Sequence, residues 1–420
     1  MMKQLCMTLG LWVAMALTAG AQTFDDDFKD STLRLDYVLA GNAAQQHIYY
    51  CNASKQARWA GRRARLTEMP LRGNGQITLT DHATGRLLYV HTFSTLFQEW
   101  QATEEATHVD RAFQTSFNVP MPKHPVDVRV TLTDFHAAVR GELRHTMDPA
   151  DVMIRRIDAP HEAFRYVWTG QTLPDGQPDV ASCIDLAIIA EGYTREEMDK
   201  FYKDSRRAAE ALFAHEPFTS MKSQFNVVAV AAESTDSGPS VPHYGLWRQT
   251  PVGAHYNTFY SDRYLMTSHM HRVYDLLDGI PFEHVIVLVN SSTYGGGGIY
   301  NQLTVTTSDH PTFRQVLVHE FGHAYGGLGD EYFYDEGFEP MYPADTEPWE
   351  PNLTTLVDFQ SKWADMLDVP GVGVFEGGGN QSKGVYRPAQ ACRMKVNEVE
   401  NFCPVCSRAL VRITDFYTSH

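Results

Sequence analysis

The sequence predicts a multidomain α+β or α/β protein, in which a β-sandwich-like N-terminal domain precedes a domain of alternating strands and helices. Three observations lead to this prediction. Short segments of alternating apolar and polar residues fill the first part of the chain, whereas buried-type strands alternate with helical patterns in the second. A helical pattern containing two histidines lies late in that second part. With 420 residues, the chain is long enough for two or three domains.

Composition and charge narrow the class of protein. Hydrophobic residues make up 43% of the chain and aromatic residues 12%, which is typical of a globular protein. The formal net charge of −16 disfavours a nucleic-acid partner, because the phosphate backbone is itself negative. Beyond the N-terminus no segment approaches the apolar length needed to cross a bilayer, so no stable membrane span is expected.

Residues 1–21 are typical of a secretory signal peptide. Lys3 supplies the positive start, Leu5–Thr18 is apolar, and Ala19–Ala21 has the small-x-small form of a cleavage site. We therefore expect export to the periplasm, the cell surface or the medium. Cleavage leaves five cysteines in a compartment that permits disulfides, and the odd number leaves at least one thiol free or paired outside the chain.

Residues 22–165 are predicted to form the β-rich N-terminal domain. Leu33–Val38 alternates apolar and polar side chains, and Val126–Leu132 does the same. Gln76–Thr80 and Arg86–His91 are separated by a turn and predict a hairpin. Strands at this spacing without helical patterns favour an antiparallel sandwich. No catalytic constellation is found in this domain.

Residues 166–183, rich in Gly and Pro, are predicted to be the linker to a second domain, residues 184–420. A capping box, Thr194–Glu197, opens a helix that is expected to run to about His215. Strands alternating with helices imply helices packed against a sheet. The mostly apolar runs expected as buried strands are Ile184–Ala190, Phe225–Ala232 and His284–Val289.

The most informative stretch is His319–His323, an HExxH sequence. Pro311 stands where a first helical residue is expected, so the motif lies on a helix. His319 and His323 are then i and i+4, and both rings leave the same face. Two imidazoles one turn apart can hold one Zn²⁺ at about 2.0–2.1 Å each. Glu320 adjoins that face and can reach a water bound to the metal.

A glycine-rich turn and several carboxylates follow the motif. Three glycines between residues 326 and 329 end the helix one turn after His323 and can reverse the chain towards the metal. The candidates for a third ligand are Asp330, Glu331 and Asp335. We assign Asp330, because a short side chain suits a backbone already close to the metal. Glu331 then supports the site by steadying a ligand histidine or the loop.

A second glycine run, residues 295–298, follows the last buried strand. It lacks GxxxxGK[ST], so a phosphate-binding loop is not expected. The next segment, Gln302–Thr307, is predicted to be a strand. One interpretation makes it an edge strand that binds a substrate backbone by strand addition, with the glycines allowing close approach. The other makes the glycines a flexible loop before an ordinary strand.

Cys392, Cys403 and Cys406 cluster near the C-terminus. The CxxC pair could form half of a zinc site, but only Cys392 lies nearby as another thiol, so a local Cys₄ zinc site is not available. We predict one disulfide among the three, with the CxxC pair contributing one partner.

Together these motifs resemble the IgA-specific metalloendopeptidase family, secreted zinc peptidases of bacteria. The resemblance implies a metzincin-like zinc-peptidase fold for the second domain, with Met394 as the methionine beneath the metal. Metzincins place their third ligand ten residues after the first, and that position here is Gly329, one residue before Asp330. The matching stretches are Ala190–Thr194, His319–His323, Gly327–Tyr332, Tyr386–Pro388, Cys392–Met394 and Phe402–Cys406.

The predicted function is that of an exported zinc-dependent endopeptidase acting on protein or peptide substrates. One Zn²⁺ per chain would be held by His319, His323 and Asp330, with a water in the fourth position. Glu320 would act as the general base. The alternative is a surface or periplasmic binding protein that retains the metal without turnover. An intact Glu320 argues against that alternative, because a pure binding site needs no base.

Overall fold

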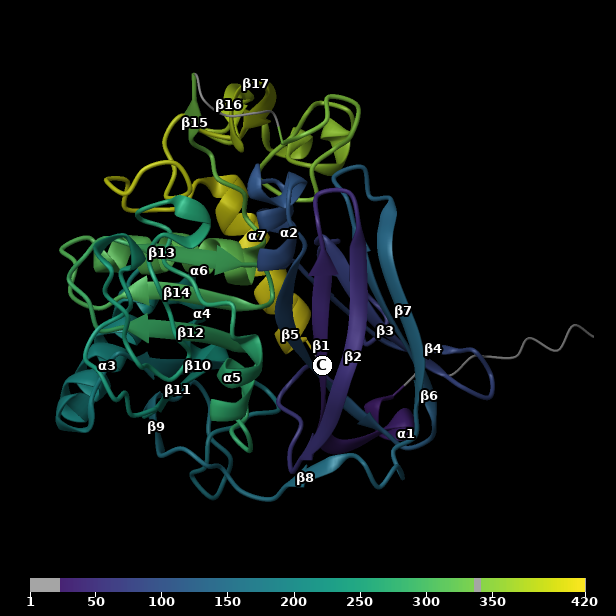
Figure 1. Ribbon diagram of the computed structural model, residues 1–420. Helices are drawn as coiled ribbons and strands as arrows, with labels where there is room; N and C mark the ends of the chain where they lie inside the picture. Colours follow the sequence, from purple (N-terminus) through teal and green to yellow (C-terminus); the bar gives the residue numbers. More distant parts are fainter. Residues whose placement is uncertain (1–22, 336–340, 420) are drawn as a thin grey trace, which may run out of the picture.

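The computed structural model describes residues 23–335 and 341–419. The expected signal peptide, residues 1–21, lies outside the described residues. Four sheets and several helices are found in the described part, which confirms the mixed α and β class. Figure 1 shows a β-rich N-terminal region beside a layered α/β region, with the last part of the chain above and between them.

The N-terminal region contains two four-stranded sheets with the orders β5-β1-β2-β8 and β4-β3-β6-β7. Neighbouring strands are antiparallel except β2 and β8. Buried and partly exposed residues alternate along most of β3 and the first half of β6, as the sequence pattern predicted. The strands are β1 (Phe28–Gly41), β2 (Gln46–Gln56), β3 (Gly75–Asp81), β4 (Leu87–Phe93), β5 (Arg111–Pro122), β6 (Val126–Thr133), β7 (Val139–Met147) and β8 (Arg155–Ile157).

A six-stranded sheet with the order β13-β14-β12-β10-β11-β9 forms the second region. Its four inner strands are parallel, and the two edge strands, β9 and β13, run antiparallel to their neighbours. The inner strands are covered on both faces, which explains their nearly continuous apolar sequences. The strands are β9 (Phe164–Trp168), β10 (Ile184–Glu191), β11 (Phe225–Val230), β12 (His284–Val289), β13 (Gly296–Ile299) and β14 (Leu303–Thr307).

The boundary between the regions differs from the expected linker. β9 already pairs with β11 in the second sheet, so that sheet begins at Phe164 rather than after residue 183. The two faces of β10 explain why the regions are not separate bodies. Ile184, Leu186 and Ile188 pack beneath the helices, whereas Ala187 and Ile189 belong to one apolar core that continues into the N-terminal sandwich. A single core therefore spans both regions.

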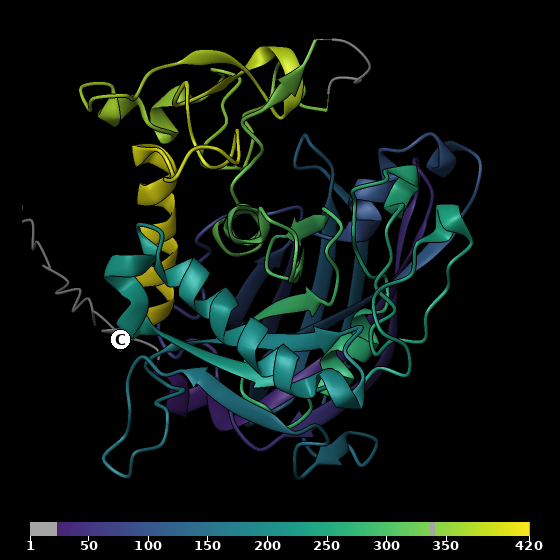
Figure 2. The ribbon, with the colours of Figure 1, turned by 90° about the vertical axis from the view of Figure 1, so that its left-hand side faces the viewer.

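Two helices cover the outer face of the six-stranded sheet. The predicted capping box is present, because Thr194 N–H donates to the Glu197 carboxylate at 2.9 Å ahead of α3 (Met198–Phe213). The histidine-containing helix is α6 (Phe313–Gly326), which begins two residues after Pro311. Figure 2 shows α3 crossing the front of the sheet and α6 nearly end-on.

The last part of the chain brings distant segments to α6. A small sheet joins β15 (Phe333–Tyr334), β17 (Asn380–Arg387) and β16 (Phe375–Gly378). A loop then leads to α7 (Pro404–Thr418), whose N-cap is Cys403. Apolar residues of α7 share the core beneath α6. Within the described residues, no helix has the length and apolar character needed to cross a membrane.

Candidate metal centre

Helix α6 ends in a way that turns the chain back towards its own histidines. Gly327 is left-handed, with φ 58°, and its N–H donates to the carbonyl of His323 at 3.0 Å. The N–H of Leu328 donates to the carbonyl of Gly322 at 3.1 Å. A Cβ on Gly327 would lie 2.8 Å from the Trp349 ring, so both conformation and space require glycine there. This turn places the residues that follow beside the last helical turn.

The two histidine rings are oriented by backbone carbonyls. Nδ1 of His319 lies 3.0 Å from the carbonyl oxygen of Arg393, and Nδ1 of His323 lies 2.5 Å from that of Leu328. Because a carbonyl can only accept, each Nδ1 carries the proton when the imidazole is neutral. The lone pairs therefore lie on the two Nε2 atoms, which face each other at 3.0 Å. This is the tautomer that a metal-binding histidine requires.

Asp330 completes the group. Its Oδ1 lies 3.2 Å from Nε2 of His319 and 3.1 Å from Nε2 of His323. Zinc ligands at about 2.0–2.1 Å in tetrahedral directions would be separated by about 3.3–3.4 Å, close to these distances. The same oxygen is buried and, while both imidazoles are neutral with the proton on Nδ1, has no hydrogen-bond donor among the described residues. Two lone pairs and an orphaned carboxylate oxygen directed at one point suit a bound cation.

Electrostatics point to the same position. Burial would raise the pKa of the Asp330 carboxyl, but His323 and His319 overcome it and hold that pKa well below its usual range. Burial likewise opposes charge on His323, yet Asp330 raises the pKa of this imidazole to about 9. The site thus attracts positive charge strongly, either as a proton or as a metal ion.

Glu320 lies beside the group without joining the Asp330 contact. A carboxylate oxygen of Glu320 and a ring nitrogen of each motif histidine lie within 4.8 Å of one another. Burial raises the pKa of this carboxyl, while His319 and His323 lower it. A carboxyl poised in this way close to a metal position can take a proton from a water held there.

The glycine run beside Glu320 forms the edge strand β13. A Cβ on Gly298 would lie 2.2 Å from the backbone oxygen of Glu320, so the strand packs directly on α6. Residues 302–307 were expected either as an edge strand or as an ordinary strand after a flexible glycine loop, and both expectations need correction. β14, the strand predicted from Gln302–Thr307, lies inside the sheet, and the glycines are the edge. A bridge from Tyr264 to Gly296 covers part of the outer side of that edge.

Met394 and Glu331 occupy different sides of the site. Met394 is fully buried, and its sulfur would lie 2.8 Å from a Cβ added to Gly322, so it packs against α6 between the two histidines. Glu331 points away from the histidines. Its Oε1 accepts from Asn352 Nδ2 at 3.0 Å, and its backbone N–H donates to the Met394 carbonyl at 2.8 Å. Asp335, the remaining candidate for the third ligand, lies four residues after Glu331 and is exposed to solvent.

Some residues around the centre were not found from the sequence. Asn352 is fully buried and bonds both the N–H and the carbonyl of Gly329, at 2.7 and 2.9 Å. Glu99, from α2 (Leu96–Gln101) of the N-terminal region, accepts a hydrogen bond from the hydroxyl of Tyr264. Desolvation raises the pKa of Glu99 to about 7, and the Tyr264 hydrogen bond and His323 oppose that rise. No local motif marks either residue, because each reaches the site through tertiary structure.

The predicted disulfide is not formed. Cys51, Cys183 and the three C-terminal cysteines are all free thiols in the described chain. Sγ of Cys392 and Sγ of Cys406 are 3.8 Å apart, whereas a disulfide requires about 2.05 Å. The three C-terminal thiols gather instead around Glu331, a residue that the sequence pattern did not connect with them.

Two histidines and a carboxylate directed at one point, with a second carboxyl alongside, are the arrangement of a metal-dependent peptidase. The family model described as IgA Peptidase M64 matches residues 175–371 and 368–414, more than half of the chain. The model described as Peptidase M64 N-terminus matches residues 23–144. The chain therefore belongs to the IgA Peptidase M64 family, and it is a peptidase by that membership. A search of curated proteins found no match.

Proposed function

We propose that this peptidase is an exported zinc-dependent endopeptidase with a metzincin-like catalytic region. The observation that carries the proposal is the convergence of the two Nε2 atoms and Asp330 Oδ1, each within 3.2 Å of the others. Two imidazoles and one carboxylate leave a fourth tetrahedral position open, which is typical of catalytic rather than structural zinc. Met394 beneath α6 supports the metzincin-like assignment.

His319, His323 and Asp330 are the residues that would hold the zinc. When bound, zinc lowers the pKa of its water towards about 7 and polarises the scissile carbonyl. Glu320 takes the proton of the attacking water and later delivers it to the leaving amine. Burial raises the pKa of Glu320, which makes its carboxyl a better proton acceptor for this exchange. The carbonyls of Arg393 and Leu328 keep the imidazoles in the ligand tautomer throughout.

The alternative is a binding protein that holds metal without turnover. Glu320 favours the enzyme, because it is a carboxyl held near the metal position with no hydrogen bond to another side chain that would explain it as a structural residue. The absence of such a hydrogen bond holds for the described part of the chain. A binding site would gain nothing from such a group, whereas water activation depends on it.

The test is Glu320→Gln, assayed on casein with zinc content measured in parallel. The variant should keep its zinc and its fold while kcat/KM falls by about 10²–10⁴-fold, the usual contribution of general acid–base assistance. Glu210→Gln, an exposed position on α3, serves as the matched control and should leave activity unchanged. Activity of Glu320→Gln within about threefold of wild type would reject the proposed base. Casein cleavage by wild type that persists after chelation would reject the metal.

Export is proposed from residues 1–21 alone. Fractionation of expressing cells should recover the protein outside the cytoplasm, and N-terminal sequencing of that material should begin at Gln22, directly after Ala21. A mature chain that still begins at Met1 and stays in the cytoplasm would contradict the proposal.

A further inference from the structure

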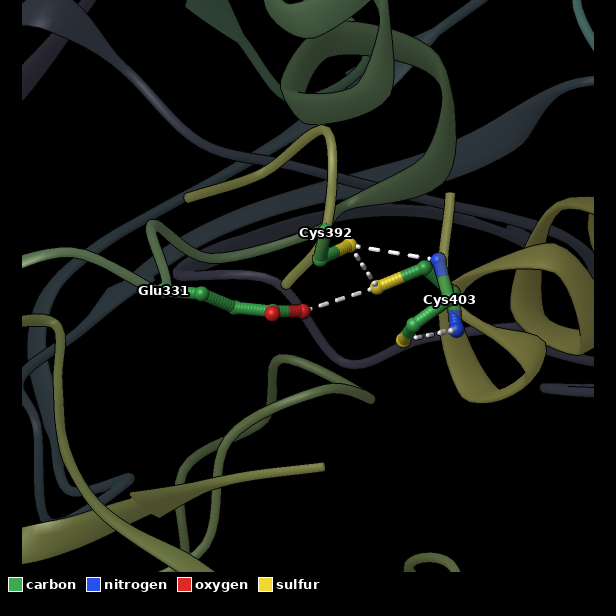
Figure 3. A group of neighbouring side chains, drawn as sticks. Glu331, Cys392 and Cys403 are labelled. Carbon is green, nitrogen blue, oxygen red and sulfur yellow. Dashed lines mark hydrogen bonds between the residues drawn. The ribbon is translucent and has the colours of Figure 1, made fainter. Parts of the chain in front are cut away.

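A second cluster of metal-ligating side chains lies behind the first. Glu331, Cys392, Cys403 and Cys406 each offer one ligand atom, and all four atoms lie within 4.8 Å of one another. Figure 3 shows the side chains of Glu331, Cys392 and Cys403 directed towards a common centre. At most 5% of any of the four residues is exposed, so the cluster is closed to solvent.

Hydrogen bonding leaves the cluster incomplete. Glu331 is inaccessible to solvent, and its Oε2 has no hydrogen-bond partner among the described residues. Oε1 is 3.0 Å from the Cys406 sulfur and 3.0 Å from Asn352 Nδ2. Thiols are weak donors, so three of them compensate poorly for the burial of a carboxylate. A buried carboxylate with one oxygen against a sulfur and the other without a partner among the described residues is poorly satisfied, which favours a bound cation among these four groups.

The distances suit a tetrahedral metal. Zinc–sulfur bonds of about 2.3 Å in tetrahedral directions place two sulfurs about 3.8 Å apart. The Sγ atoms of Cys392 and Cys406 are separated by 3.8 Å. A disulfide between them would require movement of nearly 2 Å, and it would leave Cys403 and the Glu331 carboxylate buried without a counterpart. Metal binding satisfies all four groups at once, whereas a disulfide satisfies two.

Backbone N–H groups donate to two of the three sulfurs, which helps to stabilise thiolates there. Cys403 is the N-cap of α7, where the positive end of the helix dipole lies, and its sulfur accepts from the N–H of Cys406 at 3.5 Å. The N–H of Cys403 donates to the sulfur of Cys392 at 3.3 Å. Arg387 and Arg393 lie near enough to interact electrostatically with Glu331 and Cys392. These cations offset the negative charge that three thiolates and a carboxylate leave on a divalent metal complex.

We propose that Glu331, Cys392, Cys403 and Cys406 hold a second, structural zinc ion. Three soft sulfur ligands and one carboxylate, closed on all four sides, select zinc over hard cations such as Mg²⁺ or Ca²⁺. The ion would join the turn after α6 to two segments more than 60 residues later in the chain, the loop at Cys392 and the start of α7. The expectation of one zinc per chain is thereby raised to two.

A metal ion in the cysteine site would also stabilise the geometry of the histidine site. Glu331 directly follows Asp330, and Cys392 directly precedes Arg393, whose carbonyl orients His319 at 3.0 Å. The backbone of Glu331 is further bonded to Met394 at 2.8 Å. An ion that fixes Glu331 and Cys392 therefore fixes the neighbours that supply and orient ligands of the catalytic site. This role rests on the proposed function, whereas the existence of the second ion does not.

The experiment is metal analysis by mass spectrometry of the purified mature chain and three variants. Wild type should hold about two zinc ions per chain, and His323→Ala about one, because only the open site loses a ligand. Cys403→Ser should lose the ion of the closed site. Cys183→Ser is the matched control, since Cys183 is also buried and free but lies outside the cluster, and it should retain both ions.

Cobalt substitution identifies the ligands independently of peptidase activity. Wild type and His323→Ala reconstituted with Co²⁺ should show the near-ultraviolet thiolate-to-metal charge-transfer band, because their cysteines are intact. Cys403→Ser should lack it. If Cys403→Ser fails to fold, the spectrum and stoichiometry of His323→Ala still decide the question. Loss of all zinc from His323→Ala, absence of the thiolate band, iron or copper in place of zinc, or a disulfide in non-reduced peptide maps would each overturn the proposal.

The outcomes separate this proposal from the proposed function. A protein with the thiolate band but without chelator-sensitive casein cleavage would retain the second site and lose the peptidase mechanism. Cleavage that depends on a single zinc, held without cysteine ligands, would retain the mechanism and remove the second site.

Discussion

Two adjacent carboxylates, Asp330 and Glu331, enter opposite environments. The Asp330 side chain is 19% exposed and meets two histidines that are 13% and 17% exposed, so its group opens to solvent. Glu331 is fully buried among cysteines. An open site leaves room for water and substrate, whereas a closed site leaves room only for a metal. The difference separates a centre suited to chemistry from one suited to holding the chain together.

The ligand types sharpen the contrast. The open group offers nitrogen and oxygen with a carboxyl, Glu320, alongside. The closed group offers three sulfurs and one carboxylate. All four residues are buried, so a substrate in solvent cannot exchange a proton with them. Two successive side chains of the loop after α6 thus contribute to different groups.

The largest expected effect separates the two carboxylates directly. Asp330→Ala removes a ligand from the open group, so zinc at that site and casein cleavage should both fall to background, while the closed site retains its ion. Asp335→Ala, at an exposed position five residues further on, is the matched control and should resemble wild type. Zinc content and activity are measured on the same preparations.

Glu331→Ala tests the other carboxylate of the pair. It should remove the ion of the closed site and weaken the open one only indirectly. If Glu331→Ala empties the open site while Asp330→Ala leaves it filled, the two roles are exchanged and the assignment of both residues is wrong.

A smaller effect is expected at Asn352, which lies between the two groups. Its side chain bonds Gly329 on both backbone atoms and Glu331 on Oε1. Asn352→Ala would leave the buried N–H of Gly329 without a partner and loosen the turn that delivers Asp330. Zinc affinity of the open site should fall by about 10–100-fold, as for other residues that orient metal ligands. Competition with a chromophoric chelator measures this affinity.

Asn52→Ala is the matched control for Asn352, because Asn52 is exposed on β2 in the N-terminal region. It should leave zinc affinity unchanged. An Asn352→Ala variant with the affinity of wild type would show that the turn keeps its shape without these hydrogen bonds, and that its geometry comes from the glycines alone.

Much of the fold followed from local pattern. The alternating strands, the buried parallel strands and the capping box at Thr194 each depend on neighbours in sequence, and each is found in the structure. The i and i+4 spacing likewise brought His319 and His323 together. Such features are fixed by periodicity, which a sequence displays directly.

Features that depend on tertiary contacts could not be obtained in this way. The glycines at 295–298 permit both a loop and an edge strand, and only the packing of Gly298 against Glu320 decides between them. Cys392, Cys403 and Cys406 predicted a disulfide because no fourth ligand lies near them in sequence. Their partner, Glu331, is 61 residues before the first of them, and the fold alone brings it there. Asn352 and Glu99 likewise reach the site through the fold, so no local sequence pattern predicts their positions.

The smallest effect is expected for Glu99, a carboxyl of the N-terminal region that interacts electrostatically with the open site. The open site lies in the field of this N-terminal carboxyl, whose pKa is raised to about 7 by desolvation against the opposing effects of the Tyr264 hydrogen bond and His323. A pKa raised above the usual value of about 4.5 means that the folded state holds the proton more tightly than the unfolded state. Stability from this group is therefore present at low pH and is lost as pH rises towards 7.

Glu99→Gln removes that titration. The variant should melt at a higher temperature than wild type at pH 8, where Glu99 must be charged in the folded protein, and the difference should disappear near pH 4, where the carboxyl is neutral in both states. Because the Glu99 residue is exposed to solvent, screening by water should keep the gain small. Glu104→Gln, at an exposed position, is the control. A melting difference that is the same at both pH values would show that the Glu99 proton is not linked to folding.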